Sequence, residues 1–252
     1  MNPDDLDAMP DPEPQRGVGV IAPFDLALDR ELWRWVPPAV SLHVTRTAYV
    51  PVPVTVELAS RVSDPAAVRA ATRDLLAPEP EVITYACSSG SFVDGATGEH
   101  QLRQVMGQAG APQAVTASGA LVRAAEVLGL RRLAIAAPYV PAVTERLRGF
   151  LDEHGIEVVT SVGLGLQAAI WKVGYRQVVD IVRSADRPEA EAVFVACTNL
   201  PTYDLIAPLE AELGKPVLTA NQVTVWAALQ AMGLEAVGQG QQLVTAQSAT
   251  AA

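Results

Sequence analysis

Short apolar runs alternate with amphipathic segments along nearly the whole chain, and this rhythm restricts the fold more than any other feature of the sequence. The apolar runs are rich in Val and Ile and end in turn-forming residues, as strands buried on both faces of a sheet do. Strands that alternate with helices of this length predict an α/β fold with parallel sheets flanked by helices. The expected strands are 17–23, 41–50, 81–87, 131–138, 156–162, 191–197 and a run between 214 and 221. The expected helices are 29–35, 64–76, 118–129, 141–155, 174–185, 203–214 and 222–233.

Several residues mark where these helices begin and end. Asp64 followed by Pro65 predicts a helix N-terminus, because Asp accepts a bond from a free backbone N–H and Pro has none to lose. Ser118 is the expected N-cap of the next helix, 118–129, and Gly129 is its expected end. The segment SSGS, 88–91, is expected to form a turn.

Composition narrows the function. The charged fraction is 18%, which suits sheets buried on both faces. The net charge of −10 argues against nucleic acid as a partner, since phosphate binding needs clustered Lys and Arg. The sequence contains no uninterrupted apolar stretch of about 18 residues, so no membrane span is expected. Residues 1–15 are acidic and proline-rich, which predicts a disordered leader and no signal peptide. With two cysteines and no export signal, we expect a cytoplasmic protein.

Two cysteines occupy matching motifs. TYACSSGS (84–91) and FVACTNLP (194–201) each combine an apolar strand, a small Ala, a Cys and then hydroxyl residues. The motifs lie about half the folded chain apart, which indicates an internal repeat of two similar α/β halves. Ligands of parallel sheets bind at the carboxyl ends of the strands. Cys87 and Cys197 are therefore expected to face a shared cleft.

The chemistry of such a thiol pair is distinctive. A thiol between a strand and a following helix lies near backbone N–H groups and a helix dipole, which predicts a lowered pKa. Two thiols on opposite faces of a planar carbon can act together, because one attacks or removes a proton while the other delivers one. The same backbone N–H groups are expected to hold a small carboxylate substrate, assisted by the side chains of Ser88, Ser89, Thr198 and Asn199.

Other chemistries fit less well. The chain has no Cys-x-x-Cys motif, and its histidines, at 43, 100 and 154, have no zinc-ligand spacing, so no metal is expected. No glycine-rich dinucleotide fingerprint follows the first strand, and no cofactor is predicted. For His100 two interpretations are open: it forms a catalytic dyad with a cysteine, or it is a surface residue without a catalytic role. A non-catalytic binding protein with two inert cysteines is the contrasting class.

Five segments carry a family resemblance: GVIAP (19–23), YACSSGSF (85–92), 116–151, ACTNLPTYDLIAPLEAELGKPVL (196–218) and the last expected helix, 222–233. At these positions the chain resembles the aspartate/glutamate racemase superfamily, and more closely the branch that holds maleate cis–trans isomerase and arylmalonate decarboxylase. The resemblance implies two pseudo-symmetric domains with the active site between them. The first would be 16–116 with about 219–252, and the second 117–218. It also implies a homo-oligomer.

The resemblance further implies a mechanism. Cys87 would add to the double bond to give a succinyl thioether, and Cys197 would handle the proton after rotation about the new single bond. Tyr139 matches a tyrosine that contacts the substrate carboxylate. The decarboxylase keeps only the second cysteine, so the presence of both argues for an isomerase, with a decarboxylase as a weaker alternative.

One position departs from the isomerase pattern. Asp25 lies roughly where the isomerases carry an asparagine, and a carboxylate there would repel a dianionic substrate. Asp25 would instead suit an ammonium or N–H group, which favours a racemase of an amino acid or hydantoin as the runner-up. The alternative interpretation of Asp25 is an N-cap for a helix over 26–35. A second substrate-holding asparagine of the isomerases has no counterpart in 164–174.

Overall fold

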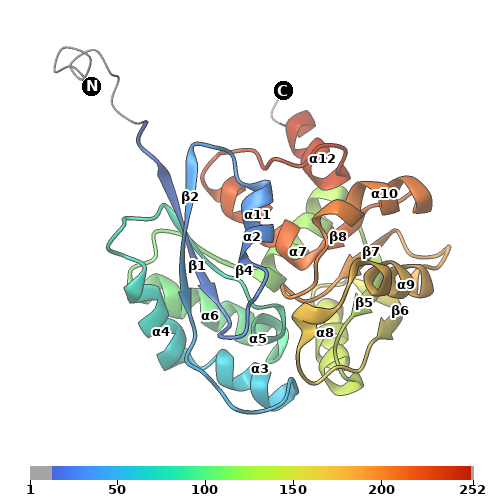
Figure 1. The fold of residues 1–252 in the computed structure, drawn as a ribbon, viewed down its shortest axis with the longest axis horizontal. Coiled ribbons are helices and arrows are strands. Elements are labelled where there is room, and N and C mark those ends of the chain that lie inside the picture. The colour runs from blue at the N-terminus through green and yellow to red at the C-terminus, as the bar shows by residue number, and fades with distance from the viewer. Residues whose placement is uncertain (1–12, 251–252) are drawn as a thin grey trace.

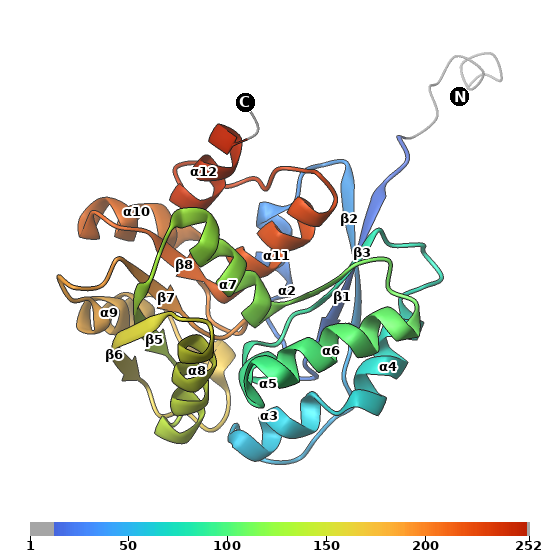
Figure 2. The same ribbon diagram turned by 180° about the vertical axis from the view of Figure 1, so that it is seen from behind.

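The computed structural model of the protein describes residues 13–250. Most of the expected leader, residues 1–12, lies outside the described residues. The chain forms two four-stranded parallel sheets flanked by helices (Figures 1 and 2), which confirms the predicted α/β class. The first sheet has the order β2-β1-β3-β4 and contains β1 (Arg16–Ala22), β2 (Val40–Arg46), β3 (Val82–Tyr85) and β4 (Ala114–Thr116). The second has the order β6-β5-β7-β8 and contains β5 (Arg132–Ala137), β6 (Glu157–Gly163), β7 (Ala192–Val195) and β8 (Val217–Thr219).

The helices follow the two sheets along the chain. Those of the first half are α2 (Asp29–Leu32), α3 (Val56–Val62), α4 (Pro65–Asp74), α5 (Ser88–Phe92) and α6 (Gly95–Ala109), with a 3₁₀ turn η1 at Trp33–Trp35. The later helices are α7 (Ala117–Leu128), α8 (Pro141–Glu153), α9 (Tyr175–Ala185), α10 (Tyr203–Leu213), α11 (Ala220–Ala231) and α12 (Gln242–Thr250), with a 3₁₀ turn η2 at Ile170–Lys172. Within residues 13–250, none of these helices is long and apolar enough to cross a membrane.

The internal repeat is visible in local capping as well as in strand order. Thr116 ends β4 and accepts a bond from the backbone N–H of Gly119, 3.0 Å away, at the start of α7. Thr219 ends β8 and accepts from the backbone N–H of Gln222 over 3.3 Å at the start of α11. Each half thus closes its sheet with the same strand, threonine cap and helix.

The last part of the chain returns to the first half. Helix α11 packs along α7, as both ribbon views show. It also contacts β3 and β4 of the first sheet. These contacts are consistent with the expected division into 16–116 with about 219–252 and 117–218. The exact domain boundaries stay a prediction.

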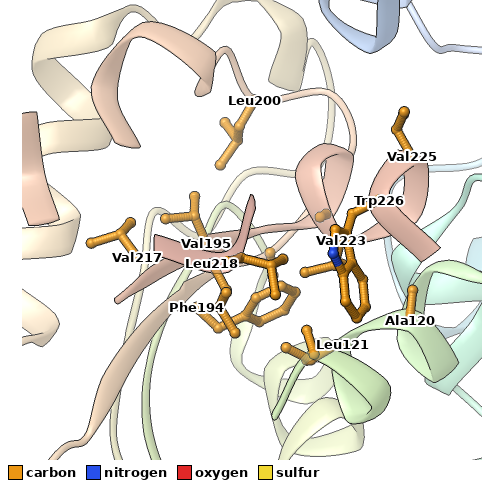
Figure 3. Packing of buried hydrophobic residues seen from close by; sticks show 14 of the residues in the cluster. Ala120, Leu121, Phe194, Val195, Leu200, Val217, Leu218, Val223, Val225 and Trp226 are labelled. Atoms are coloured by element: carbon orange, nitrogen blue, oxygen red, sulfur yellow. The ribbon is translucent and has the colours of Figure 1, made fainter. Parts of the chain in front are cut away.

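The largest hydrophobic core joins the second sheet to α7 and α11. Strands β7 and β8 contribute Phe194 and Leu218, and α11 contributes Trp226, which is 1% exposed (Figure 3). Leu121 of α7 closes the same layer. Since α7 and α11 also contact the first sheet, this core connects the two halves around the site described below.

Two sequence predictions about local structure are wrong. Ser118 does not cap α7; Thr116 does, two residues earlier, because its side chain lies where it can accept the Gly119 N–H. The segment 88–91 is not a simple turn but the first residues of α5. By contrast, Asp64 accepts from the backbone N–H of Ala67 over 2.9 Å, which confirms it as the cap of α4.

Candidate functional site

Both cysteines leave equivalent strands. Cys87 follows β3 and Cys197 follows β7, and each strand is third in the order of its sheet. The two thiols line one cavity to which both halves contribute. The cavity brings together all eight residues that the sequence predicted for the site, namely Asp25, Cys87, Ser88, Ser89, Tyr139, Cys197, Thr198 and Asn199.

The cavity is small and adjoins a larger one. Its volume is about 30 Å³, close to the share of one water molecule in the liquid. A neighbouring cavity of about 480 Å³ shares Asp25, Val54 and Leu58 with it. Val54, which lines both cavities, donates its backbone N–H to the backbone oxygen of Gln167, which lines the larger one, over 2.7 Å.

Cys87 occupies the N-cap position of α5. Its Sγ lies 3.8 Å from the hydroxyl oxygen of Ser89, and only 6% of the residue is exposed. Burial raises the pKa of the Cys87 thiol to about 11, although a hydrogen bond from the Gly90 N–H lowers it in part. The negative charge of Asp25 raises the pKa of this thiol further.

Cys197 has an unusual backbone. Its φ is 86°, in the left-handed region that residues other than glycine rarely adopt. Such strain persists only where surrounding structure holds it, and it is concentrated at functional sites. The backbone N–H of Asn199 donates to the Cys197 Sγ over 3.4 Å. Burial nevertheless raises the pKa of the Cys197 thiol to about 12, and the Asp25 charge adds to the rise.

The sequence prediction of lowered thiol pKa values is therefore wrong. The expected backbone donors are present, but Cys87 is buried and Cys197 is partly buried, and this desolvation disfavours the thiolate more than the donors favour it. In addition, α5 has only 5 residues, and α10 begins at Tyr203, well after Cys197. Neither thiol has a long helix aligned behind it.

Hydroxyl groups surround the thiols. Tyr139 follows β5 and is 2% exposed, and burial raises its pKa well above the ordinary value. The Ser88 hydroxyl is buried and makes no hydrogen bond of ordinary geometry among residues 13–250, although it lies near enough to the Tyr139 phenol to lower the pKa of that phenol in part. An unpaired buried hydroxyl is costly, so the Ser88 side chain is available to a bound ligand.

Two further serines, which the sequence analysis did not identify, hold the backbone of Ser88 in place. Ser91 and Ser118 place their Oγ atoms 2.6 Å apart. Ser91 donates to the backbone oxygen of Ser88 over 2.9 Å, and Ser118 donates to the same oxygen over 3.3 Å. The network fixes the backbone of Ser88 beside the cavity, which explains why Ser118 does not serve as a helix cap.

Thr198 and Asn199 hold the two halves together. The Thr198 hydroxyl donates to the backbone oxygen of Ala86 over 3.2 Å, next to Cys87. The Asn199 amide donates to the backbone oxygen of Asp25 over 3.0 Å and accepts from the N–H of Ala27 over 2.9 Å. The polar groups of the Asn199 side chain are thus engaged with the loop after β1.

Glu31 is a second anchor that sequence analysis did not identify. Its Oε1 accepts from the backbone N–H of Thr202 over 2.7 Å and from the Thr202 hydroxyl over 2.6 Å. The Asn221 amide, 3.4 Å from the same oxygen, also donates to the backbone oxygen of Thr198 over 3.1 Å. These bonds tie the loop after Cys197 to α2 and α11.

Asp25 does not cap a helix. Helix α2 begins at Asp29, with Leu28 in the preceding position, so the interpretation of Asp25 as an N-cap is wrong. Asp25 instead lines both cavities. Burial raises the pKa of its carboxyl, and the Arg46 guanidinium offsets part of that rise.

His100 lies away from the thiols. It is exposed on α6, where its ring nitrogen is 2.9 Å from the Gln104 amide. The alternative of a Cys–His dyad is therefore wrong. No group of three or more His, Cys, Asp or Glu side chains placed to hold a metal occurs in the described part of the chain.

Known proteins are similar to this chain in sequence and in fold. The family model for arylmalonate decarboxylase matches residues 60–244. A maleate isomerase of Geobacillus stearothermophilus is 29% identical over 164 residues, which are 62% of this chain and 65% of that enzyme. An arylmalonate decarboxylase of Bordetella bronchiseptica is 31% identical over 156 residues, which are 60% of this chain and 65% of that enzyme. The match thus spans just under two thirds of the length of either relative.

Solved structures extend the similarity over the whole fold. The maleate isomerase Iso from Pseudomonas putida S16 matches with a TM-score of 0.81 at 26% identity, and the match covers 91% of this chain and 98% of that chain. Because the family model also matches most of the sequence, the protein belongs to the arylmalonate decarboxylase family, in the branch of the aspartate/glutamate racemase superfamily that includes the maleate isomerases.

Proposed function

We propose that this protein is an isomerase that acts on a small carboxylate through the thiol pair of Cys87 and Cys197, without a cofactor. The observation that carries the proposal is the shared cavity, to which equivalent strands of the two halves each contribute one thiol. The similar proteins include maleate isomerases, which favours an isomerisation of the same kind.

In the leading mechanism the substrate is a cis-enoate. Cys87 first gives its proton to water, because a pKa of about 11 keeps the thiol neutral at rest. The resulting thiolate forms a C–S bond to one alkene carbon, and the displaced π electrons take a proton from the Cys197 thiol at the other carbon. Rotation about the new single bond follows. The Cys197 thiolate then removes a proton from that carbon, the alkene re-forms as the trans isomer, and the C–S bond breaks to return the Cys87 thiolate.

The substrate carboxylate would lie among hydroxyl and N–H donors. Ser88 has a free buried hydroxyl, and Ser89 and Tyr139 line the same cavity. Developing negative charge is stabilised by such fixed donors in a site that excludes water. Thr198 and Asn199 would act by fixing the two cysteine loops, through the bonds to Ala86 and Asp25.

A racemase is the second candidate, and Asp25 favours it. In this reaction one thiolate removes the α-proton of an amino-acid-like substrate, and the other thiol delivers a proton to the opposite face. No C–S bond forms. The acidic side chain beside the thiols would suit the nitrogen of such a substrate.

Proton NMR in D₂O tests the proposal. We would incubate the protein separately with maleate, aspartate, glutamate, a substituted hydantoin and an arylmalonate. A trans alkene, or loss of an α-proton signal, supports isomerisation or racemisation, and its disappearance in Cys87→Ala and Cys197→Ala assigns both thiols. His100→Ala, outside the cavity, should keep full activity. Loss of CO₂ from the arylmalonate alone would replace the isomerase with a decarboxylase, and turnover of none would favour a binding protein.

A further inference from the structure

The charges around the two cavities are one-sided. Asp25 is the acidic side chain that lines both, and no Lys, Arg or His is among the described residues that line either one. The Arg46 guanidinium donates to the backbone oxygen of Leu26 over 2.5 Å. Asp25 forms no ion pair within residues 13–250. The side chains that line the cavities therefore offer a substrate one carboxylate and no cation, although the Arg46 guanidinium lies near enough to Asp25 to lower its pKa in part.

The opposite wall offers neutral donors. The buried Ser88 hydroxyl is without a partner, and the Tyr139 hydroxyl and the first N–H groups of α5 lie in the same region. These groups are suited to one carboxylate. A second carboxylate on the same small molecule would be forced toward Asp25, and two like charges in a site with little water repel each other strongly.

Asp25 is also held in place. Its backbone oxygen accepts from the Asn199 amide over 3.0 Å, which ties the backbone of Asp25 to the loop after Cys197. The Asp25 side chain lines the same cavity as Cys87 and Cys197. The carboxylate is therefore placed where it can accept an N–H of a substrate.

We propose that Asp25 is a specificity residue that selects substrates with one carboxylate and an N–H donor, either an amide or an ammonium group, and disfavours dicarboxylates. The inference rests on the proposed function, because it assumes that the thiol cavity receives the substrate. It is compatible with both mechanisms above: a cis-enoate monoamide offers an alkene to Cys87, and an amino acid offers an α-proton.

A matched pair of unreactive ligands tests the inference without turnover. Succinate and its monoamide have the same size and differ by one charge and one N–H donor. We would measure the dissociation constants of both by calorimetry, with 4-aminobutanoate as the ammonium ligand. The wild-type protein should bind the monoamide or the ammonium ligand about tenfold or more tightly than succinate. Asp25→Asn should abolish or reverse that order, whereas Asp29→Asn, which removes a charge outside both cavities, should keep it.

The outcomes separate this inference from the proposed reaction. Equal binding of succinate and the monoamide by the wild type, or an unchanged ratio in Asp25→Asn, overturns the role of Asp25. The expected binding order, without turnover of maleate, its monoamide, the amino acids or the hydantoin, keeps the role of Asp25 and contradicts the proposed reaction. Faster turnover of maleate than of its monoamide by the wild type keeps the reaction and overturns the inference. If none of the ligands binds, the cavity is not a carboxylate site, and the inference is wrong.

Discussion

Asn199 donates its side-chain amide to the backbone oxygen of Asp25 over 3.0 Å, although the two residues are 174 positions apart in the sequence. Asn199 follows Cys197 in the second half, and Asp25 follows β1 in the first. The same side chain accepts from the backbone N–H of Ala27. This pair of bonds fixes an acidic residue of one half beside the cysteine loop of the other.

Replacing Asn199 by Ala should reduce both stability and turnover. The Ala27 N–H loses its acceptor, which should cost about 1 to 3 kcal/mol in the free energy of unfolding. The displaced loops should lower kcat by about tenfold to a hundredfold, since small misplacements at a reacting centre have large effects. Urea unfolding and the turnover assay measure the two effects. The control is Gln104→Ala, which removes an exposed amide on α6. Equal losses of stability and turnover in the two variants would contradict a positioning role for the bonds of Asn199 to Asp25 and Ala27.

The cysteines should react slowly with iodoacetamide near neutral pH. Alkylation needs the thiolate, and burial raises the pKa of Cys87 to about 11 and that of Cys197 to about 12. Because each thiol is neutral far below its pKa, the rate should rise about tenfold per pH unit from about pH 7 to about pH 10. Mass spectrometry on Cys87→Ala and Cys197→Ala reports the remaining thiol in each case.

The same experiment tests the electrostatic effect of Asp25. A nearby negative charge disfavours the thiolate, so Asp25→Asn should lower the pKa of both thiols and move the alkylation profile to lower pH. A plateau below about pH 8 in the wild type would instead mean that a thiolate exists at rest, and burial would not control these groups.

The backbone of Cys197 predicts an unusual order of stability. Both Cys197→Gly and Cys197→Ala remove the thiol, but only Gly adopts a φ of 86° without strain. The Gly variant should therefore be more stable than the Ala variant by about 1 kcal/mol, measured by urea unfolding. Gly ordinarily destabilises relative to Ala through the entropy of the unfolded chain. A less stable Gly variant would show that the backbone relaxes once the thiol is gone.

Glu31 should be more important for stability than its position on a short helix suggests. Without its carboxylate, the backbone N–H groups of Thr202 and Tyr203 lose their acceptor. We expect Glu31→Ala to lower the free energy of unfolding by about 2 to 4 kcal/mol, whereas Asp29→Ala on the same helix should change it little. Urea unfolding measures both variants. Equal losses in the free energy of unfolding would contradict the anchoring role of Glu31.

The sequence predicted each strand of the described residues except β4, and it predicted that the two cysteines meet in one cavity. Buried parallel strands are continuous apolar runs, and both cysteines directly follow such runs. Helix α6 was missed because its sequence contains three glycines, Gly95, Gly98 and Gly107, which are poor helix formers. Tertiary packing decides that case.

The finer properties of the site depend on contacts that no local pattern reveals. The thiol pKa values follow from burial, which the helix-terminus argument did not include. The engagement of Asn199 with Asp25 joins segments from opposite ends of the chain. Thr116 and Ser118 are both good cap residues, and only the position of each side chain decides which of them caps α7.

The most direct test of the thiol pair is a turnover measurement on three samples with whichever substrate the wild type converts. These are Cys87→Ala, Cys197→Ala and an equal mixture of the two variants. Because both thiols line the cavity of a single chain, we expect each variant to be inactive and the mixture to stay inactive. Substantial activity in either variant, or recovery in the mixture, would contradict a reaction carried by Cys87 and Cys197 together.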